Sequence, residues 1–142
     1  MTYAIRRATA EDGPELARLF TLLGHPTTAA EVATRWPAFS AESVALVAAA
    51  EGGPLLGAMT LSHRLVLHHA ARVGRVTALV VDEARRGQGI GRALMAEAEK
   101  ALREAGCGLL ELTSGVDRTA AHAFYEHLGY DRTSVRLAKA LA

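Results

Sequence analysis

The chain has 142 residues, half of them apolar, and its 16 basic and 15 acidic residues give a formal net charge of +1. This length and balance predict one globular domain, residues 1–142, and exclude the global field that would hold a protein on nucleic acid or an anionic membrane. No stretch reaches the roughly 18–20 apolar residues that cross a bilayer, and the first residues carry charges where a secretory signal is apolar. Cys107 is the single cysteine, which excludes an intrachain disulfide, so we expect a cytoplasmic location.

The first half of the chain predicts a strand, two helices and three further strands. Residues 3–9 alternate between apolar and polar, which is typical of a strand. Apolar residues at helical spacing then predict one helix that ends at Gly24 and a second that begins at Thr28 and ends near Pro37. Three strand-like runs follow, separated by the turn sequences EGGP and HHAA, and they indicate an antiparallel meander.

The second half predicts a long helix that begins after a glycine-rich loop and ends at Gly106. A short strand begins at Cys107, a short helix ends at Gly129, and residues 132–141 alternate as in a final strand. The resulting order of strand, two helices, three strands, helix, strand, helix and strand indicates an α/β fold with a mixed sheet.

The glycine-rich loop lies between the strand-like run ALVVD and the long helix. Gly87, Gly89 and Gly91 leave the backbone accessible there, and three arginines, at positions 85, 86 and 92, surround them. The first amides of a helix lack intrahelical acceptors and carry about half a positive charge, so anions bind there. Without Cβ atoms in the way, a diphosphate can contact those amides directly. The sequence therefore predicts a local phosphate site.

Three other interpretations of this loop fit its residues less well. A P-loop requires lysine followed by serine or threonine after its last glycine, and here Arg92 follows Gly91. A dinucleotide fingerprint requires a third small residue that neither GQGIGR nor GIGRAL supplies, although Glu111 lies roughly twenty residues on, where the acidic partner belongs. A plain turn with solvated arginines explains the glycines, but not the two preceding arginines or the strand-to-helix context.

Two motifs carry a resemblance to a known family. RGQGIG, residues 86–91, fits the Arg/Gln-x-x-Gly-x-Gly/Ala signature of the GNAT N-acetyltransferase superfamily, and AHAFYEHLGY, residues 121–130, resembles a later motif of that family. The order of elements is also similar over almost the whole chain. The resemblance implies a central, mostly antiparallel sheet with helices on both faces.

The resemblance further implies an acyltransferase that uses acetyl-CoA as co-substrate. The diphosphate of CoA would bind the loop, the strand ending in ALVVD would bind the pantetheine arm, and the amides near its end would face the acyl carbonyl. Arg118 matches the place of a polar residue that contacts pantetheine or caps a helix. The implied cofactor-binding residues are Leu79, Val80, Val81, Arg86, Gly87, Gln88, Gly89, Ile90, Gly91, Arg92 and Arg118.

Acetyl transfer to an amine leaves a thiolate to protonate and an ammonium to deprotonate. Tyr125 matches the family tyrosine that protonates the CoA sulfur, and its usual pKa of about 10 keeps it protonated at neutral pH. The base is open, because Thr77 stands where many members carry a glutamate. Glu111, His122 or a water chain could each take the proton.

The resemblance leaves the acceptor open between a small-molecule amine and a protein amine. It is compatible with a homodimer, since dimers are common among members. Metal binding is not expected, because His68 and His69 lie in a turn and His122 and His127 are five residues apart, off one helical face. The alternative to an enzyme is a catalytically silent acyl-CoA-binding module, and the missing glutamate at Thr77 motivates it.

Overall fold

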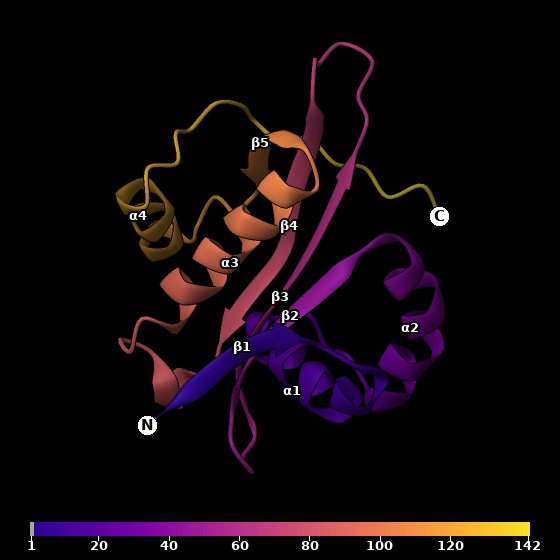
Figure 1. Ribbon diagram of the computed structural model, residues 1–142, viewed down its shortest axis with the longest axis vertical. Coiled ribbons are helices and arrows are strands. Elements are labelled where there is room, and N and C mark those ends of the chain that lie inside the picture. The colour runs from indigo at the N-terminus through magenta and orange to yellow at the C-terminus, as the bar shows by residue number, and fades with distance from the viewer. Residues whose placement is uncertain (1) are drawn as a thin grey trace. The chain divides into compact units, whose positions relative to one another are not determined.

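The computed structural model describes residues 2–142, and the chain divides into two compact units, the first ending at Glu111 and the second running from Leu112 to Ala142. The expectation of a single domain over 1–142 stays a prediction. The first unit contains most of the secondary structure (Figure 1). Its elements in chain order are β1 Tyr3–Arg7, the 3-10 helix η1 Ala10–Asp12, α1 Gly13–Leu23, α2 Ala29–Glu42, β2 Val44–Ala50, β3 Leu55–Arg64, β4 Arg72–Val81, the 3-10 helix η2 Glu83–Arg85, α3 Ile90–Glu104 and β5 Cys107–Leu112.

The strands form one sheet in sequence order, β1-β2-β3-β4-β5, and the first three pairings are antiparallel. The last pairing has the opposite sense. A Cβ on Gly108 would lie 3.0 Å from the Cβ of Ala71, and Glu111 pairs with Arg75, so the two strands advance in the same direction. The sheet is therefore mixed and mostly antiparallel, as predicted, and β5 ends level with the middle of β4.

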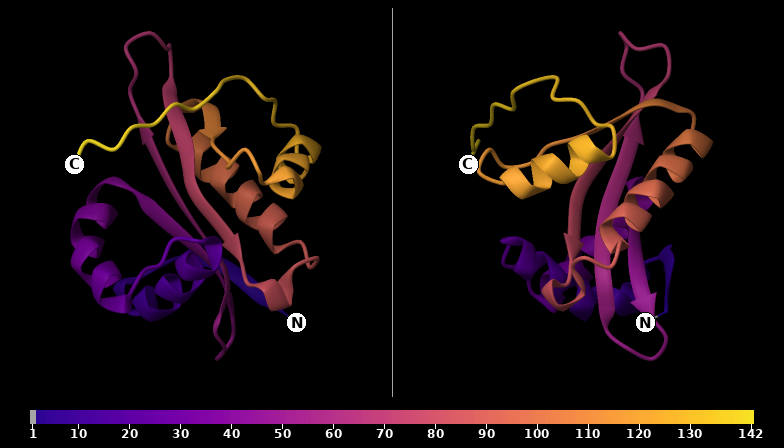
Figure 2. Two further views of the ribbon diagram at one scale, coloured as in Figure 1. Left: turned by 180° about the vertical axis from the view of Figure 1, so that it is seen from behind. Right: turned by 90° about the vertical axis from the view of Figure 1, so that its left-hand side faces the viewer.

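Helices cover both faces of this sheet (Figure 2). On one face, α1 packs its buried residues Leu16 and Leu19 against Val47, Ala58 and Val80 from three neighbouring strands. On the other face α3 approaches so closely that a Cβ on Gly57 would lie 3.1 Å from the Ile90 side chain. Burial of β3 on both faces explains its nearly continuous apolar sequence.

The helix boundaries follow from capping, with one difference from the expectation. The Thr28 hydroxyl accepts from the Glu31 amide at 3.1 Å and opens α2, and Gly24, with φ of 106°, closes α1 as predicted. We expected α2 to end near Pro37, but it continues to Glu42. Proline removes only one helical hydrogen bond, and the rings of Trp36 and Phe39, 5.7 Å apart, lie on either side of it.

The second unit contains one helix, α4 Thr119–His127, which ends before Gly129 with φ of 97°, as predicted. The predicted final strand over residues 132–141 is wrong, because that segment carries no strand. Its alternation is real, yet Val135 and Leu137 are 84% and 91% exposed. Alternation alone does not make a strand, because backbone groups must also find a partner strand.

Within residues 2–142, no helix is both long enough and apolar enough to span a membrane.

Candidate functional site

The glycine-rich loop joins the end of β4 to α3 through backbone conformations that glycine permits. Gly87 and Gly89 have φ of 81° and 76°, in the left-handed region that other residues avoid. At both positions an added Cβ would meet nothing within 4 Å, so the space beside the backbone is open. The sequence prediction of an accessible backbone is therefore confirmed at these two glycines.

The start of α3 is positively charged and lacks a side-chain cap. Gly89 occupies the N-cap position, where it offers no side-chain oxygen to the first amides, and the first turn contains no acidic residue. Arg86 and Arg92 are exposed on either side, and neither forms an ion pair with a carboxylate among residues 2–142. Amides, helix dipole and guanidinium groups therefore favour an anion at this helix end.

A network centred on Arg18 of α1 fixes the end of β4, and no sequence motif predicts this network. Its guanidinium contacts Asp82 at 2.9 Å, Glu15 at 2.9 Å and the Leu55 carbonyl at 3.0 Å. The Asp82 carboxylate in turn accepts from the Ala84 amide at 3.2 Å and opens η2. The spacing of Glu15 and Arg18 indicates a helical ion pair, but no sequence signal joins either one to Asp82, 64 residues after Arg18.

The same network lowers the pKa of its carboxyl groups. For Asp82 the main cause is the hydrogen bond from the Ala84 amide, and for Glu15 it is the hydrogen bond from Arg18. Both groups are therefore carboxylates at neutral pH. The segment that enters the loop is thus held by charged hydrogen bonds.

Residues Leu79, Val80 and Val81 form the last part of β4, opposite Met59, Ala58 and Gly57 of β3. Val80 is buried, whereas its two neighbours are half-buried. Since β5 ends level with the middle of β4, it does not extend along these three residues. The end of β4 therefore extends beyond β5, and it continues through η2 into the loop from Arg86 to Arg92.

Two candidate bases have partners of their own. Glu111 is paired with Arg75 at 3.4 Å and its side chain is 46% exposed. The Nε2 atom of His122 lies 2.9 Å from the Gly115 carbonyl, so Nε2 donates to that carbonyl. Thr77, at the expected place of a glutamate, forms a hydrogen bond with Thr60, and the two hydroxyl oxygens are 2.6 Å apart.

Tyr125 and Arg118 both belong to the second unit, Leu112–Ala142. Burial raises the pKa of the Tyr125 phenol above its usual value, and the charge of Arg118 opposes that shift. The ring lies 5.1 Å from Phe124 and 6.2 Å from Tyr130 between centroids. Tyr125 is therefore a protonated phenol at neutral pH.

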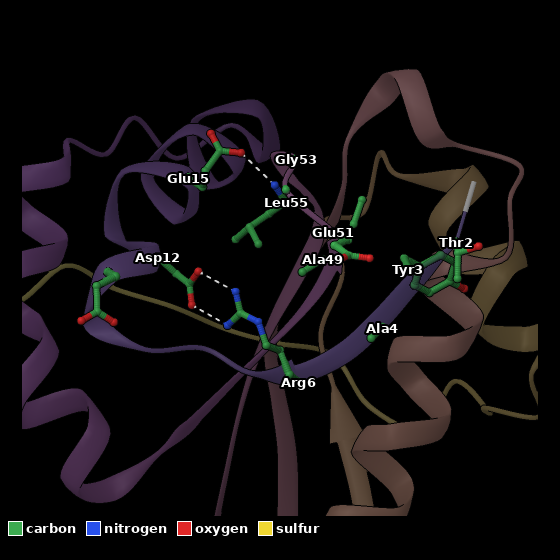
Figure 3. A pocket seen from close by; sticks show the side chains of 13 residues that line it. Thr2, Tyr3, Ala4, Arg6, Asp12, Glu15, Ala49, Glu51, Gly53 and Leu55 are labelled. Carbon is green, nitrogen blue, oxygen red and sulfur yellow. Dashed lines mark hydrogen bonds and ion pairs between the residues drawn. The ribbon is translucent and has the colours of Figure 1, made fainter.

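A hollow of about 570 Å³ lies between β1, the start of α1 and the turn from β2 to β3, and it contains none of the predicted site residues (Figure 3). Two of its carboxylates, Asp12 and Glu15, have partners. Asp12 binds Arg6 at 2.8 and 2.9 Å, and Glu15 accepts from the Leu55 amide at 2.9 Å. In the part of the chain that the structure describes, no three His, Cys, Asp or Glu side chains come together as metal ligands.

Comparison with known proteins identifies the family. A model of the Acetyltransferase (GNAT) family matches residues 10–130. An aminoalkylphosphonate N-acetyltransferase from Salmonella typhimurium is 41% identical over 93 residues, which are 66% of this chain and 60% of that protein. The chain therefore spans less than two thirds of the length of this curated relative.

Solved structures share the fold over nearly the whole chain. A putative acetyltransferase from Agrobacterium tumefaciens has a TM-score of 0.84 and 28% identity over 96% of this chain and 99% of its own. A protein described as a transcriptional regulator from Bacillus halodurans has a TM-score of 0.87 and 23% identity, over 99% of this chain and 100% of its own, which shows the fold alone. From the matching family model and these relatives, the chain belongs to the GNAT acetyltransferase family.

Proposed function

We propose that the protein transfers an acetyl group from acetyl-CoA to a primary amine. The observation that carries this proposal is the uncapped, positively charged start of α3, with Gly87 and Gly89 open beside it. Membership of the GNAT family supports the same chemistry. The loop supports a diphosphate-bearing ligand, and family membership supports an acyl donor rather than a nicotinamide cofactor.

The residues of this chain would divide the work of binding. The amides at the start of α3 and the side chains of Arg86 and Arg92 would hold the diphosphate, with Gln88 and Ile90 contributing backbone contacts. The last residues of β4, from Leu79 to Val81, would bind the pantetheine arm and direct an amide toward the acyl oxygen. Arg118 would contact the pantetheine arm.

Tyr125 would act as the general acid. Its raised pKa keeps the proton on the phenol at neutral pH, so it can donate that proton to the leaving sulfur. Positioned proton donors of this kind typically contribute 10²–10⁴-fold to rate. The amine would attack directly, with no acetylated residue on the protein.

For the acceptor we propose a small-molecule amine, with a protein amine as the alternative. The similarity to aminoalkylphosphonate N-acetyltransferase supports the small amine. The chain's near-neutral charge gives no long-range attraction for a strongly charged protein surface. We further propose that the protein works in the cytoplasm and needs no metal.

The first experiment measures thermal stability with acetyl-CoA, CoA or NADH. A ligand at a hundred times its dissociation constant adds about 2.7 kcal/mol to the free energy of unfolding. We expect acetyl-CoA and CoA to stabilise and NADH to have no effect. Stabilisation by NADH alone, or by none of the three, would contradict the donor assignment.

The second experiment separates an enzyme from a silent acyl-CoA-binding module. Thiol release from acetyl-CoA is followed with aminoalkylphosphonates, simple alkylamines and a peptide with a free N-terminus. An enzyme releases thiol with at least one of these amines and loses that activity in Tyr125→Phe. A silent module is stabilised by CoA but releases no thiol with any of them.

A further inference from the structure

The irregular residue of β4 is Thr77, at a bulge in its pairing with β3. Thr60 pairs with Ala78 and the next residue, Leu61, pairs with Val76, so Thr77 is an extra residue on β4. A bulge re-aims the side chain of its extra residue and is frequent beside functional sites. Thr77 lies two residues before Leu79, the start of the strand end that we propose to bind the acyl donor.

The bulge turns the Thr77 hydroxyl toward Thr60 on β3. The two hydroxyl oxygens are 2.6 Å apart, and Thr77 is exposed while Thr60 is half-buried. In such a pair one hydroxyl donates to the other, which leaves one proton and several lone pairs for a third group. The exposure of Thr77 makes those lone pairs accessible from solvent.

The strands that surround the pair supply few titratable groups. Ser62 lies opposite Arg75 in the register, and Arg75 is bonded to Glu111 of β5. On β3, His63 accepts a hydrogen bond from Arg72 at 2.9 Å through Nδ1. Residues Val44 and Ala45 of β2, which face Leu61 and Thr60, are apolar. Among these groups, Glu111 is the carboxylate to test as a base.

We propose that the Thr60–Thr77 hydroxyl pair is the positioning site for the acceptor amine. This inference rests on the proposed function, because it assumes transfer to an amine. A neutral amine donates one N–H to a hydroxyl oxygen of the pair, which aims its lone pair toward the donor's carbonyl carbon. The pair is thus a neutral hydrogen-bond acceptor at the position where a carboxylate was expected.

The transfer balances without a base in the pair. The nitrogen lone pair forms the N–C bond, the C–S bond breaks with its electron pair on sulfur, and the thiolate receives a proton. The ammonium loses one proton to solvent water at the exposed Thr77, because a protonated hydroxyl is far too acidic to keep it. The products are an amide and a thiol.

A neutral hydroxyl pair and a carboxylate base predict different pH dependences of kcat/KM for the amine. Only the unprotonated amine has the lone pair that attacks the carbonyl carbon, so kcat/KM for the amine should rise about tenfold per pH unit. The rise should continue up to the pKa of the free amine in solution, and changing the amine should move the plateau with that pKa. A carboxylate base at this place would instead add a step near its own pKa.

The test measures kcat and KM of the full chain for the amine and for acetyl-CoA. Thr77→Val and Thr60→Val should each raise KM for the amine about five- to tenfold, since each removes one hydroxyl from the pair. Thr77→Ser should restore wild-type values, and KM for acetyl-CoA should stay unchanged. Thr34→Val, at an exposed threonine of α2, controls for the same substitution elsewhere.

Two results would overturn the inference. Wild-type KM for the amine in both valine variants would show that the hydroxyls do not contact it. A pH profile with a step that disappears in Glu111→Gln would make Glu111 the base instead. The proposed function fails differently, because then the wild-type chain releases no thiol with any amine. Circular dichroism of each variant separates loss of folding from loss of binding.

Discussion

Replacing Gly89 by alanine separates the strain of the loop from its role in binding. At φ of 76° an alanine costs about 1–2 kcal/mol, and restricting the unfolded chain returns about 0.4–1 kcal/mol. The net loss is about 1 kcal/mol of unfolding free energy, or roughly 3 °C in Tm for a chain of this size. The new Cβ would lie in space that holds no protein atom within 4 Å, and we assign that space to the diphosphate.

Gly52 supplies a matched control, because it has φ of 66°, equally open surroundings and a place in the turn from β2 to β3. Gly52→Ala should lower Tm by a similar amount and leave acetyl-CoA affinity unchanged. Gly89→Ala should also weaken acetyl-CoA about tenfold or more, because obstructing one hydrogen bond to a charged group costs about 1.5–3 kcal/mol. Titration calorimetry measures both. Equal affinities in the two variants would refute the assignment of the loop to phosphate.

Three further predictions test other parts of the molecule. Tyr125→Phe should lower kcat by about 10²-fold or more while KM for acetyl-CoA stays constant in steady-state assays, and full activity would exclude it as the acid. Arg18→Met should lower the unfolding free energy by about 1–2 kcal/mol in urea titrations, a value that is already reduced because the side chain is partly exposed. The variant should also bind acetyl-CoA a few-fold more weakly, because Asp82 loses the contact that holds it. An unchanged affinity would show that the network does not support the loop. The hydrogen bond from Arg6 lowers the pKa of Asp12 in the folded state. The stability that this bond contributes is therefore complete above the unfolded-state pKa of about 3.9, and it is lost as pH falls through the lower folded-state pKa. Asp12→Asn should therefore show a shallower fall in stability between about pH 5 and 2, whereas a slope equal to wild type would assign the acid sensitivity to other carboxyl groups.

Elements were predictable wherever a local signal decides the structure. Helix α3 follows from its apolar stripe and from Gly106, and the strands of the meander follow from turn sequences that separate runs of apolar residues. The final strand could not be predicted correctly from residues 132–141, because pairing depends on a partner strand elsewhere in the chain. Helix α2 continues past Pro37, and the Trp36 and Phe39 rings that contact each other there are a tertiary feature that the sequence pattern does not reveal.

The candidate site divides in the same way. Open glycines at 87 and 89 follow from the sequence, since a left-handed backbone demands that residue type. The Arg18–Asp82 contact and the Thr60–Thr77 pair do not, because each joins side chains that only the tertiary register brings together. The bulge at Thr77 in particular leaves no mark in the alternation of β4.

This division bears on how the two substrates would be recognised. If the donor is held mainly by backbone amides at the start of α3 and the end of β4, glycines and strand geometry preserve its site while most side chains are free to differ. The acceptor has no such backbone cradle, so side chains such as Thr60 and Thr77 must select it. Exchanging that hydroxyl pair for other polar side chains should therefore change which amine is used and at which pH, and should leave the affinity for acetyl-CoA as it is.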